Sequence, residues 1–445
     1  MTLSALLAQR EADGRPIRVG LVGAGKLGGT WLAQARRTPG VHVVAVADLR
    51  PDHARLALAR AGFAAERCAA DDVSEAARLG TTWVGEDAVS VVRAPEIEIV
   101  VEATGSPAAG VRHALACAAT AKSLVMANAE ADALAGPLLA ERVRQGGGVY
   151  SLANGDQPAL VCALVDWARA SGFDVVAAGK GTRFLPRFRR STPETVWADT
   201  GVTPEQAAAA GLNARRYNAV LDGTKSAVEM AIVANATGLD APPNGLGFHP
   251  CGARELPRVL RPEADGGVLA RAGQVEVVSS IERDGAPVPD DLRHGVFVVI
   301  AASSRHVATA FGEHGVATDD SGRYAALWRP AHLAGLELGV SVASAALRGE
   351  STGEPVAWRA DVIAVARRDL APGAQLDGEG GYAVYGRLVP AEVSRRLRAL
   401  PIGLATGVPL VRAVAADAPV TLADVALDED AEVVRVRREM ELLFG

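Results

Sequence analysis

A glycine-rich turn between two apolar runs constrains the fold of this chain more than any other feature. Gly23, Gly25 and Gly28 have the GxGxxG spacing within the segment 17–47, where one apolar run precedes the turn and a helical pattern and a second apolar run follow it. Such runs are typical of buried parallel strands, so the segment predicts a strand–helix–strand unit. The first glycine permits a tight turn, the second lets the backbone approach a pyrophosphate, and the third lets helix and strand pack closely. We therefore expect a dinucleotide with its pyrophosphate over the helix N-terminus, the alternative being a turn that serves packing alone.

The acidic residue of this unit bears on the choice of cofactor. Asp48 follows Gly28 by twenty residues, at the end of the second apolar run. Its carboxylate can accept a hydrogen bond from the ribose 2′-hydroxyl of NAD and would repel the 2′-phosphate of NADP. Arg50 has the opposite effect, because its guanidinium could hold a 2′-phosphate. The sequence leaves NAD and NADP both open.

Further cofactor contacts are expected where another predicted strand ends. Thr104 and Gly105 follow the apolar run 97–103, at the edge where open α/β sheets bind ligands. A plain strand-to-helix turn with a Ser or Thr cap is the alternative. The predicted contacts are Gly23, Gly25, Lys26, Leu27, Gly28, Asp48, Arg50, Thr104 and Gly105.

The remaining pattern predicts three domains for the 445 residues, at roughly 100–200 residues per domain. Alternating strands and helices over 1–155 predict an α/β Rossmann domain with a doubly wound parallel sheet. Residues 156–350 predict an α+β central catalytic domain that ends in a helix over 324–347. Turn residues at 348–355 mark a break, after which 351–445 predict a small β-rich domain.

Composition and charge exclude several classes of protein. Hydrophobic residues make up 49% of the chain and charged residues 22%, which excludes a mainly disordered protein. A net charge of −6 gives no field that would attract nucleic acid or an acidic membrane. The four cysteines form no CxxC pair, and no apolar run reaches the ~18 residues of a bilayer span. We expect a cytoplasmic homo-oligomer that takes a small acidic or phosphorylated substrate and binds neither nucleic acid nor membranes.

Lysine is rare here, with four lysines among 46 basic residues. Each lysine is therefore a candidate for a role that needs a titratable ammonium. Lys180 lies between two glycines after an apolar run, with Arg183 and Arg187 close behind. This arrangement can collect a phosphate or carboxylate and polarise a carbonyl during hydride transfer. A solvated basic loop is the alternative.

A second lysine opens a long apolar helix. Asp222, Lys225, Ser226 and Glu229 fall on one helical face at i, i+3, i+4 and i+7, and Asn235 would extend that face. A polar stripe on a helix of Ala, Val, Ile and Met predicts the wall of a site. Alternatively, the aspartate is a helix cap and the lysine and glutamate form a surface pair.

The sequence identifies no metal site. Adjacent carboxylates at Asp319 and Asp320 suit a hard divalent cation, although an acidic turn that caps the next helix is the favoured reading. The eight histidines lack HxH or HExxH spacing, so we expect His249 and His332 to be ordinary interior or boundary residues. No GxSxG is present, so hydrolase chemistry has no support. A Mg²⁺ or Mn²⁺ ion stays open, with unknown ligands.

Several motifs together resemble the homoserine-dehydrogenase-like oxidoreductases that carry a C-terminal SAF (β-clip) domain. The motifs are VGLVGAGK at 19–26, GKGT at 179–182, LDGTKS at 221–226, DSGRYAA at 320–326 and LDGEGGY at 376–382. The resemblance implies a Rossmann fold and NAD(P), with Asn128 near the nicotinamide. One activity within that family is that of the DXR-like reductoisomerases, which convert 1-deoxy-D-xylulose 5-phosphate into 2-C-methyl-D-erythritol 4-phosphate with NADPH for isoprenoid synthesis. Segments 367–373 and 411–417 resemble SAF domains, which bind sugars, close over a site or serve as a structural appendage.

A literal homoserine dehydrogenase is disfavoured, because that enzyme has a lysine directly after its Ala-Asn motif and Ala129 stands there in this chain. We expect an NAD(P)-dependent oxidoreductase of a small polar, phosphorylated carbonyl or polyol, with DXR-like reductoisomerase as the most specific hypothesis. A hydroxy-acid or sugar-acid dehydrogenase and a non-catalytic NAD(P) sensor are the alternatives. The expected roles are oxyanion and proton handling by Lys180 and Lys225, acid/base or metal contact by Asp222 or Glu229, and an anion clamp of Arg183 and Arg187.

Overall fold

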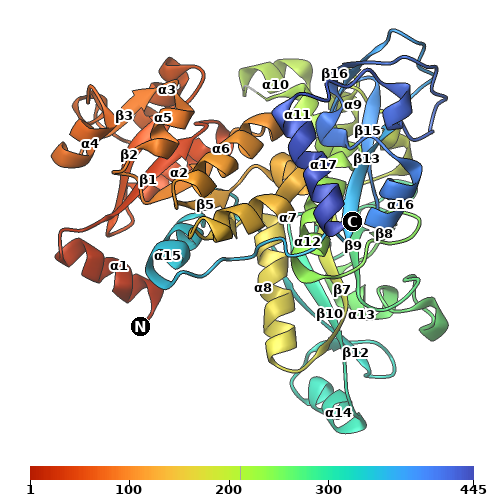
Figure 1. Cartoon of the computed structure of the whole chain (residues 1–445). Helices are drawn as coiled ribbons and strands as arrows, with labels where there is room; N and C mark the ends of the chain where they lie inside the picture. The colour runs from red at the N-terminus through yellow and green to blue at the C-terminus, as the bar shows by residue number, and fades with distance from the viewer. Residues whose placement is uncertain (211) are drawn as a thin grey trace. The chain divides into compact units, whose positions relative to one another are not determined.

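The computed structural model describes residues 1–210 and 212–445 and divides into two compact units (Figure 1). Unit 1 consists of residues 1–160, 333–356 and 435–443, and unit 2 of residues 161–332, 357–434 and 444–445. The units thus group the chain differently from the three consecutive domains expected from the sequence. The separate, SAF-like domain expected over 351–445 stays a prediction.

Unit 1 is built on a six-stranded parallel sheet with the strand order β3-β2-β1-β4-β5-β6. This is the order of Rossmann folds, so the predicted doubly wound α/β fold is confirmed. Most side chains of the central strands are buried, which is why these strands read as apolar runs in the sequence. The strands are β1 (Ile17–Val22), β2 (Val41–Ala47), β3 (Trp83–Gly85), β4 (Ile99–Glu102), β5 (Ser123–Met126) and β6 (Tyr150–Leu152).

Helices of unit 1 begin at side chains that satisfy free backbone N–H groups. Ser106 and Asn128, for example, accept hydrogen bonds from the N–H groups of Ala109 and Ala131. The helices are α1 (Leu3–Ala12), α2 (Lys26–Ala35), α3 (Pro51–Arg60), α4 (Val73–Leu79), α5 (Ala88–Arg93), α6 (Pro107–Ala119), α7 (Ala129–Gln145), α15 (Gly339–Arg348) and most of α17 (Glu432–Phe444), with the 3₁₀ turn η1 (Ala65–Cys68).

The segment 333–356 completes the core of unit 1. Leu338 and Val342 belong to the same buried cluster as Leu21 and Trp31. The helix expected over 324–347 is wrong in its first part, because Tyr324–Arg329 forms strand β12 of unit 2. Pairing of this strand with a neighbouring strand outweighs the helical propensity of its alanines and leucine.

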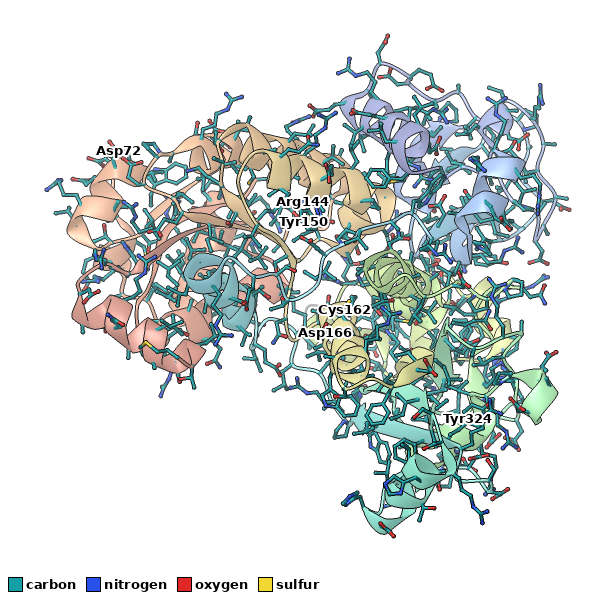
Figure 2. All side chains as sticks on the ribbon, turned by 60° about the horizontal axis from the view of Figure 1, so that its bottom comes forward. Asp72, Arg144, Tyr150, Cys162, Asp166 and Tyr324 are labelled. Atoms are coloured by element: carbon teal, nitrogen blue, oxygen red, sulfur yellow. The ribbon has the colours of Figure 1, made fainter. Side chains whose placement is uncertain are left out.

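A buried acid lies beside the last strand of unit 1. The hydroxyl of Tyr150, labelled in Figure 2, donates to Asp132 at 2.6 Å, and both residues are fully buried. Burial raises the pKa of Asp132 to about 7, and the hydrogen bond from the tyrosine lowers it in part. Asp132 is therefore an acid whose protonation depends on pH near neutrality.

Unit 2 is built on a mixed sheet with the order β11-β12-β10-β7-β9-β8. The central strand, β7, runs parallel to β9 and antiparallel to β10. The strands of unit 2 are β7 (Asp174–Thr182), β8 (His249–Pro250), β9 (Gln274–Ser279), β10 (Val296–Ala301), β11 (Ala317–Thr318), β12, β13 (Ala360–Ala366), β14 (Gln375–Asp377), β15 (Val384–Pro390) and β16 (Thr406–Pro409). Strands β13 and β15 pair with each other, as do β14 and β16, in two small antiparallel sheets.

Helix α12 (Thr224–Thr237) forms the core of unit 2 and contacts both β9 of the mixed sheet and the β13–β15 pair. The side chain of Asn235 accepts from the backbone N–H groups of Arg359 and Ala360, at 2.8 and 2.9 Å. The other helices are α8 (Gln157–Ala170), α9 (Val196–Thr200), α10 (Pro204–Ala209), α11 (Ala214–Leu221), α13 (Leu256–Val259), α14 (Arg305–Glu313) and α16 (Ala391–Leu397), with the 3₁₀ turns η2 (Pro186–Arg190), η3 (Ala253–Glu255), η4 (Glu263–Asp265), η5 (Ile402–Leu404) and η6 (Leu422–Asp424). Within the described residues, no helix combines the length and apolarity that crossing a membrane requires.

Candidate active site

The glycine loop of unit 1 joins β1 to α2 with the geometry that dinucleotide binding needs. Gly23 has a φ of +93°, which favours glycine, and a Cβ at Gly28 would lie 2.3 Å from the carbonyl oxygen of Gly23. A Cβ at Gly25 would meet no atom within 4 Å, so the space above the start of α2 is open to a ligand. The free N–H groups and the dipole of α2 favour an anion at this point. The loop therefore fits a pyrophosphate.

Asp48, at the end of β2, holds this loop in place. Its two carboxylate oxygens accept from the backbone N–H groups of Ala24 at 2.9 Å and Arg50 at 3.0 Å. The side chain of Arg50 is exposed. In this conformation each carboxylate oxygen of Asp48 already accepts a hydrogen bond from the protein backbone. The spacing of residues in the sequence could not show these two bonds.

A pocket of about 560 Å³ opens at the carboxyl ends of β1, β2 and β4. Five of the predicted cofactor residues line it, namely Gly23, Gly25, Asp48, Arg50 and Thr104. The lining of this pocket does not include Lys26, Leu27, Gly28, Gly105 or Asn128. Its position at the carboxyl edge of the sheet is where open α/β folds bind ligands.

Asn128 contacts residues of the loop that follows β4. It is fully buried, caps α7, and donates to Thr104 Oγ1 at 3.2 Å and to the carbonyl oxygen of Ser106 at 2.9 Å. It therefore fixes the loop that follows β4. A direct contact between Asn128 and a nicotinamide stays a prediction.

Sequence reasoning missed a buried pair beside the same pocket. Glu102, at the end of β4, accepts from Thr104 Oγ1 at 2.6 Å and lies 3.1 Å from His113 Nδ1. Both Glu102 and His113 are buried, and His113 lines the pocket. A carboxylate at the end of an apolar strand was the signal that could have identified Glu102.

In unit 2 the structure brings together two of the predicted catalytic residues. The ammonium of Lys180, on β7, donates to the carboxylate of Glu229, on α12. Lys180 is 5% exposed and Glu229 4% exposed. A buried, paired ammonium in an apolar helix–sheet layer can donate to an oxygen that gains negative charge, and its carboxylate partner keeps it in position.

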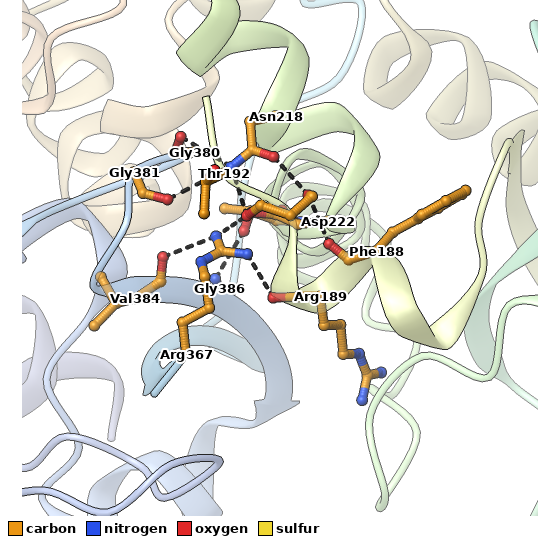
Figure 3. Close-up of polar contacts among 12 residues, drawn as sticks. Phe188, Arg189, Thr192, Asn218, Asp222, Arg367, Gly380, Gly381, Val384 and Gly386 are labelled. Carbon is orange, nitrogen blue, oxygen red and sulfur yellow. Dashed lines mark hydrogen bonds and ion pairs between the residues drawn. The ribbon is translucent and has the colours of Figure 1, made fainter. Parts of the chain in front are cut away.

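The rest of the predicted polar stripe does not join this pair. Asp222 is buried and paired with Arg367, which also donates to the backbone carbonyl oxygens of Arg189 and Val384 (Figure 3). Burial raises the pKa of Asp222, while Arg367 opposes that shift. Asp222 caps the end of α11 and precedes α12, so it does not share a helical face with Lys225 and Glu229; it accepts from the backbone N–H of Thr224 and joins this turn to residues 357–434. Lys225 is half-buried.

The two predicted anion-clamp residues differ in their surroundings. Arg183 is half-buried directly after β7, and its Nε is buried with no hydrogen-bond partner. The side chain of Arg187 is 64% exposed and lies 3.6 Å from Asp199. The geometry favours Arg183 as an anion ligand, and for Arg187 it favours the solvated-loop alternative.

The acidic turn at 319–320 is structural. Asp319 pairs with Arg261 and Asp320 with Arg258, each at 2.7 Å. Across residues 1–210 and 212–445 no group of three or more His, Cys, Asp or Glu side chains could hold a metal ion. The binding of Mg²⁺ or Mn²⁺ stays a prediction.

His294, which the sequence did not single out, and His332, which was expected to be an ordinary interior or boundary residue, lie in the part of unit 2 that packs against β7. The backbone N–H of Gly181, next to Lys180, donates to the carbonyl oxygen of Gly295, so the turn before β10 lies against β7. In this turn His294 is exposed, and its carbonyl oxygen lies 2.8 Å from Nδ1 of His332. Burial, Arg293, His332 and Lys180 lower the pKa of His294. His294 and His332 are 38 residues apart in the sequence, so no local pattern links them; the fold brings them together.

A known protein family matches the part of the chain that contains Lys180 and Glu229. Residues 155–338 match the family described as "Oxidoreductase DRL, catalytic domain". The matched residues include Lys180, Glu229 and His294, while the glycine loop belongs to the Rossmann sheet of unit 1. Residues 155–338 are therefore similar to the catalytic domain of an oxidoreductase. A search among curated proteins gives no match.

Solved structures with a similar chain trace include several dehydrogenases. A homoserine dehydrogenase from Thiobacillus denitrificans is 22% identical with a TM-score of 0.35, over 50% of this chain and 49% of that one. A myo-inositol dehydrogenase from Lactobacillus casei, in complex with NAD(H) and myo-inositol, is 16% identical with a TM-score of 0.28, over 41% and 50%. A probable dehydrogenase from Thermotoga maritima is 11% identical with a TM-score of 0.35, over 74% and 86%. The chain thus spans about half the length of the first two, and similarities this weak carry no argument about substrate.

Proposed function

We propose that this oxidoreductase interconverts a carbonyl and a hydroxyl group of a small, polar, anionic substrate that binds unit 2 at Lys180. The observation that carries the proposal is the buried ion pair of Lys180 and Glu229 within the segment that matches an oxidoreductase catalytic domain. A lysine held in a buried layer is suited to proton transfer, because its ammonium has few competing water contacts.

A nicotinamide cofactor held at the glycine loop by Gly23, Gly25 and the start of α2 would supply the hydride for reduction of the carbonyl group. The ammonium of Lys180 donates a hydrogen bond to the carbonyl oxygen and transfers its proton to that oxygen as negative charge develops there. Glu229 holds the ammonium in place throughout. Arg183, with an unpartnered Nε, is the residue suited to bind a phosphate or carboxylate of the substrate.

The test is turnover with a panel of phosphorylated and acidic carbonyl compounds, followed by the absorbance of the reduced nicotinamide. Lys180→Met should lower kcat by about 10²–10⁴, the range for loss of a general acid, and leave the affinity for the cofactor unchanged. Arg258→Gln, which alters an exposed ion pair, is the matched control. Tight cofactor binding without turnover of any compound would favour the sensor alternative instead.

A finer form of this proposal is the reductoisomerase reaction on 1-deoxy-D-xylulose 5-phosphate. It is supported by the motif resemblance and by an arginine placed to hold a phosphate. In this form of the proposal Lys180 would stabilise the enediolate-type negative charge of the rearrangement. NMR of the product separates the two forms: a branched methylerythritol phosphate supports rearrangement, and a reduced product with an unbranched skeleton supports a plain dehydrogenase.

A further inference from the structure

We propose that unit 1 has a second binding site, separate from the cofactor pocket, which takes a small organic anion with a phosphate or carboxylate group. The site is a pocket of about 350 Å³ beside the first residues of β2. None of its lining residues also lines the pocket at the glycine loop. The inference therefore goes beyond the proposed function and does not depend on it.

The pairing of β2 leaves room for this anion pocket. Strand β3 pairs with residues 45–47 of β2, so the first residues of β2 have no neighbour in β3. Val41 and Val43 line the anion pocket, whereas Asp48, which follows the other end of β2, lines the cofactor pocket. At about 3.3 Å per residue, the chain from 41 to 48 separates the two pockets by roughly 20 Å.

Two arginines supply positive charge to the anion pocket, namely Arg36 and Arg67. A Cβ at Gly62 would lie 3.4 Å from the guanidinium of Arg36, so this group lies against bare backbone. Arg67 donates to the carbonyl oxygen of Gly80 at 2.8 Å, which holds its guanidinium in place. Among residues 1–210 and 212–445, neither guanidinium pairs with a carboxylate. Guanidinium groups bind phosphate and carboxylate through their parallel N–H donors.

His42 reports the positive potential of the anion pocket. Its ring lines the pocket, and Nε2 lies 2.7 Å from the carbonyl oxygen of Thr81. Burial is the main cause that lowers the pKa of His42, and the charges of Arg67 and Arg18 lower it further, against the hydrogen bond to Thr81. Glu98 pairs with Arg18 at 3.2 Å and does not line the pocket. A bound anion would therefore offset an unfavourable repulsion.

Carboxylates are placed differently around the two pockets. Asp48, Glu86 and Asp87 line the cofactor pocket, whereas the lining of the anion pocket contains no carboxylate. Glu66 precedes Arg67 in the chain, but its side chain is exposed and is not part of the lining. Of the two pockets, the anion pocket is thus the one whose charged side chains all favour an anion.

The rest of the lining suits an apolar group. Val41, Val43 and Phe63 line the pocket beside the arginines. A volume of about 350 Å³ lies within the range of small-molecule sites, roughly 300–1,000 Å³. Two guanidinium groups next to an apolar wall fit an organic anion better than a bare inorganic ion.

The test is titration of the full chain with inorganic phosphate, phenyl phosphate and benzoate, followed by calorimetry and by NMR of the His42 ring. Phenyl phosphate should bind more tightly than inorganic phosphate, because its ring can contact Phe63. Saturation with phenyl phosphate should raise the pKa of His42, because the anion offsets the charge of Arg67.

Variants of the two arginines locate the binding. Arg36→Gln and Arg67→Gln should each weaken the binding of phenyl phosphate about tenfold, the loss of one charge-assisted contact. Arg36 is exposed, so its replacement keeps the test valid even if Arg67→Gln disturbs the backbone at Gly80. Arg55→Gln is the matched control, since Arg55 is exposed in the same unit, pairs with Asp52 and is not part of the lining.

The outcomes decide the inference without touching the proposed function. Unchanged affinity in both arginine variants overturns it, as does binding that leaves the His42 signals unmoved, which would place the anion at the start of α2. Equal affinity for inorganic phosphate and phenyl phosphate overturns the assignment to an organic anion. No binding of any of the three compounds at millimolar concentration overturns the site as a whole. A preference for phenyl phosphate or for benzoate supports the site and identifies its acidic group.

Discussion

Replacing Asp222 tests whether this residue belongs to the catalytic site, as its sequence position suggests, or to the structural core. Asp222 and Arg367 are both buried. Among residues 1–210 and 212–445, the further acceptors of the guanidinium are the carbonyl oxygens of Arg189 and Val384, and its Nε has no acceptor. Asp222→Ala would leave a buried positive charge without its counter-ion. Loss of one partner from a buried pair costs about 3–5 kcal/mol, so we expect that decrease in the free energy of unfolding.

The opposite replacement should cost less at low pH. Arg367→Met leaves Asp222 buried alone, and burial already raises the pKa of this carboxyl, so the aspartate can take up a proton. A group whose pKa is higher in the folded state stabilises the fold at low pH, and that contribution is lost as pH rises. The loss in the Arg367→Met variant should therefore grow with increasing pH. The double variant should recover part of the loss, because it removes both charges.

Urea unfolding followed by tryptophan fluorescence and circular dichroism provides the measurement. Since the chain has two compact units, hydrogen exchange of α12 should accompany it, so that the loss is assigned to unit 2. Asp320→Ala, which breaks the exposed pair with Arg258, is the control and should change stability by less than about 1 kcal/mol. If Asp222→Ala abolished turnover with unchanged stability and unchanged α12 exchange, the structural account would be refuted.

Three further predictions concern the loop, the catalytic pair and the buried acid. Gly28→Val should abolish dinucleotide binding in calorimetry, because a Cβ at this position would lie 2.3 Å from the carbonyl oxygen of Gly23; retained affinity would contradict the loop geometry. Glu229→Gln should lower kcat while KM changes little, since the amide still fills the space but no longer carries the counter-charge of Lys180, and an unchanged kcat would argue against the pair. Asp132→Asn should remove a pH dependence of stability. With a pKa raised to about 7 in the fold against about 3.9 unfolded, the wild type loses stability from about pH 4 to pH 7, and thermal unfolding of the variant across that range should lack this loss.

Local sequence patterns predicted the Rossmann fold of unit 1 because the residues that indicate this fold lie close together in the chain. The glycine spacing, the apolar run before it and the acid after it lie within 17–48, and the structure places Gly23, Gly25 and Asp48 in the lining of one pocket at the carboxyl edge of the sheet. The helix expected over 324–347 failed for the opposite reason. Tyr324–Arg329 pairs with β10, and such pairing depends on a partner that no local pattern reveals.

The predicted catalytic residues of unit 2 show the same difference between local and tertiary signals. The rarity of lysine and the GKG setting singled out Lys180, and helical spacing singled out Glu229, but only tertiary packing joins them. The same helical spacing included Asp222, which the fold instead pairs with Arg367, 145 residues further along the chain. His294 and His332 carry no mutual signal in the sequence and meet through the turn before β10.

The amino-acid sequence by itself determined the class of fold and the position of the glycine loop, because these depend on backbone periodicity and on residues close together in the chain. The tertiary structure decided which charged side chains face each other. In an apolar interior a buried charge needs a counter-charge or hydrogen-bond partner within a few ångströms, and the partner is set by how helices and strands pack. For that reason Lys180 pairs with Glu229, and Asp222 pairs with Arg367.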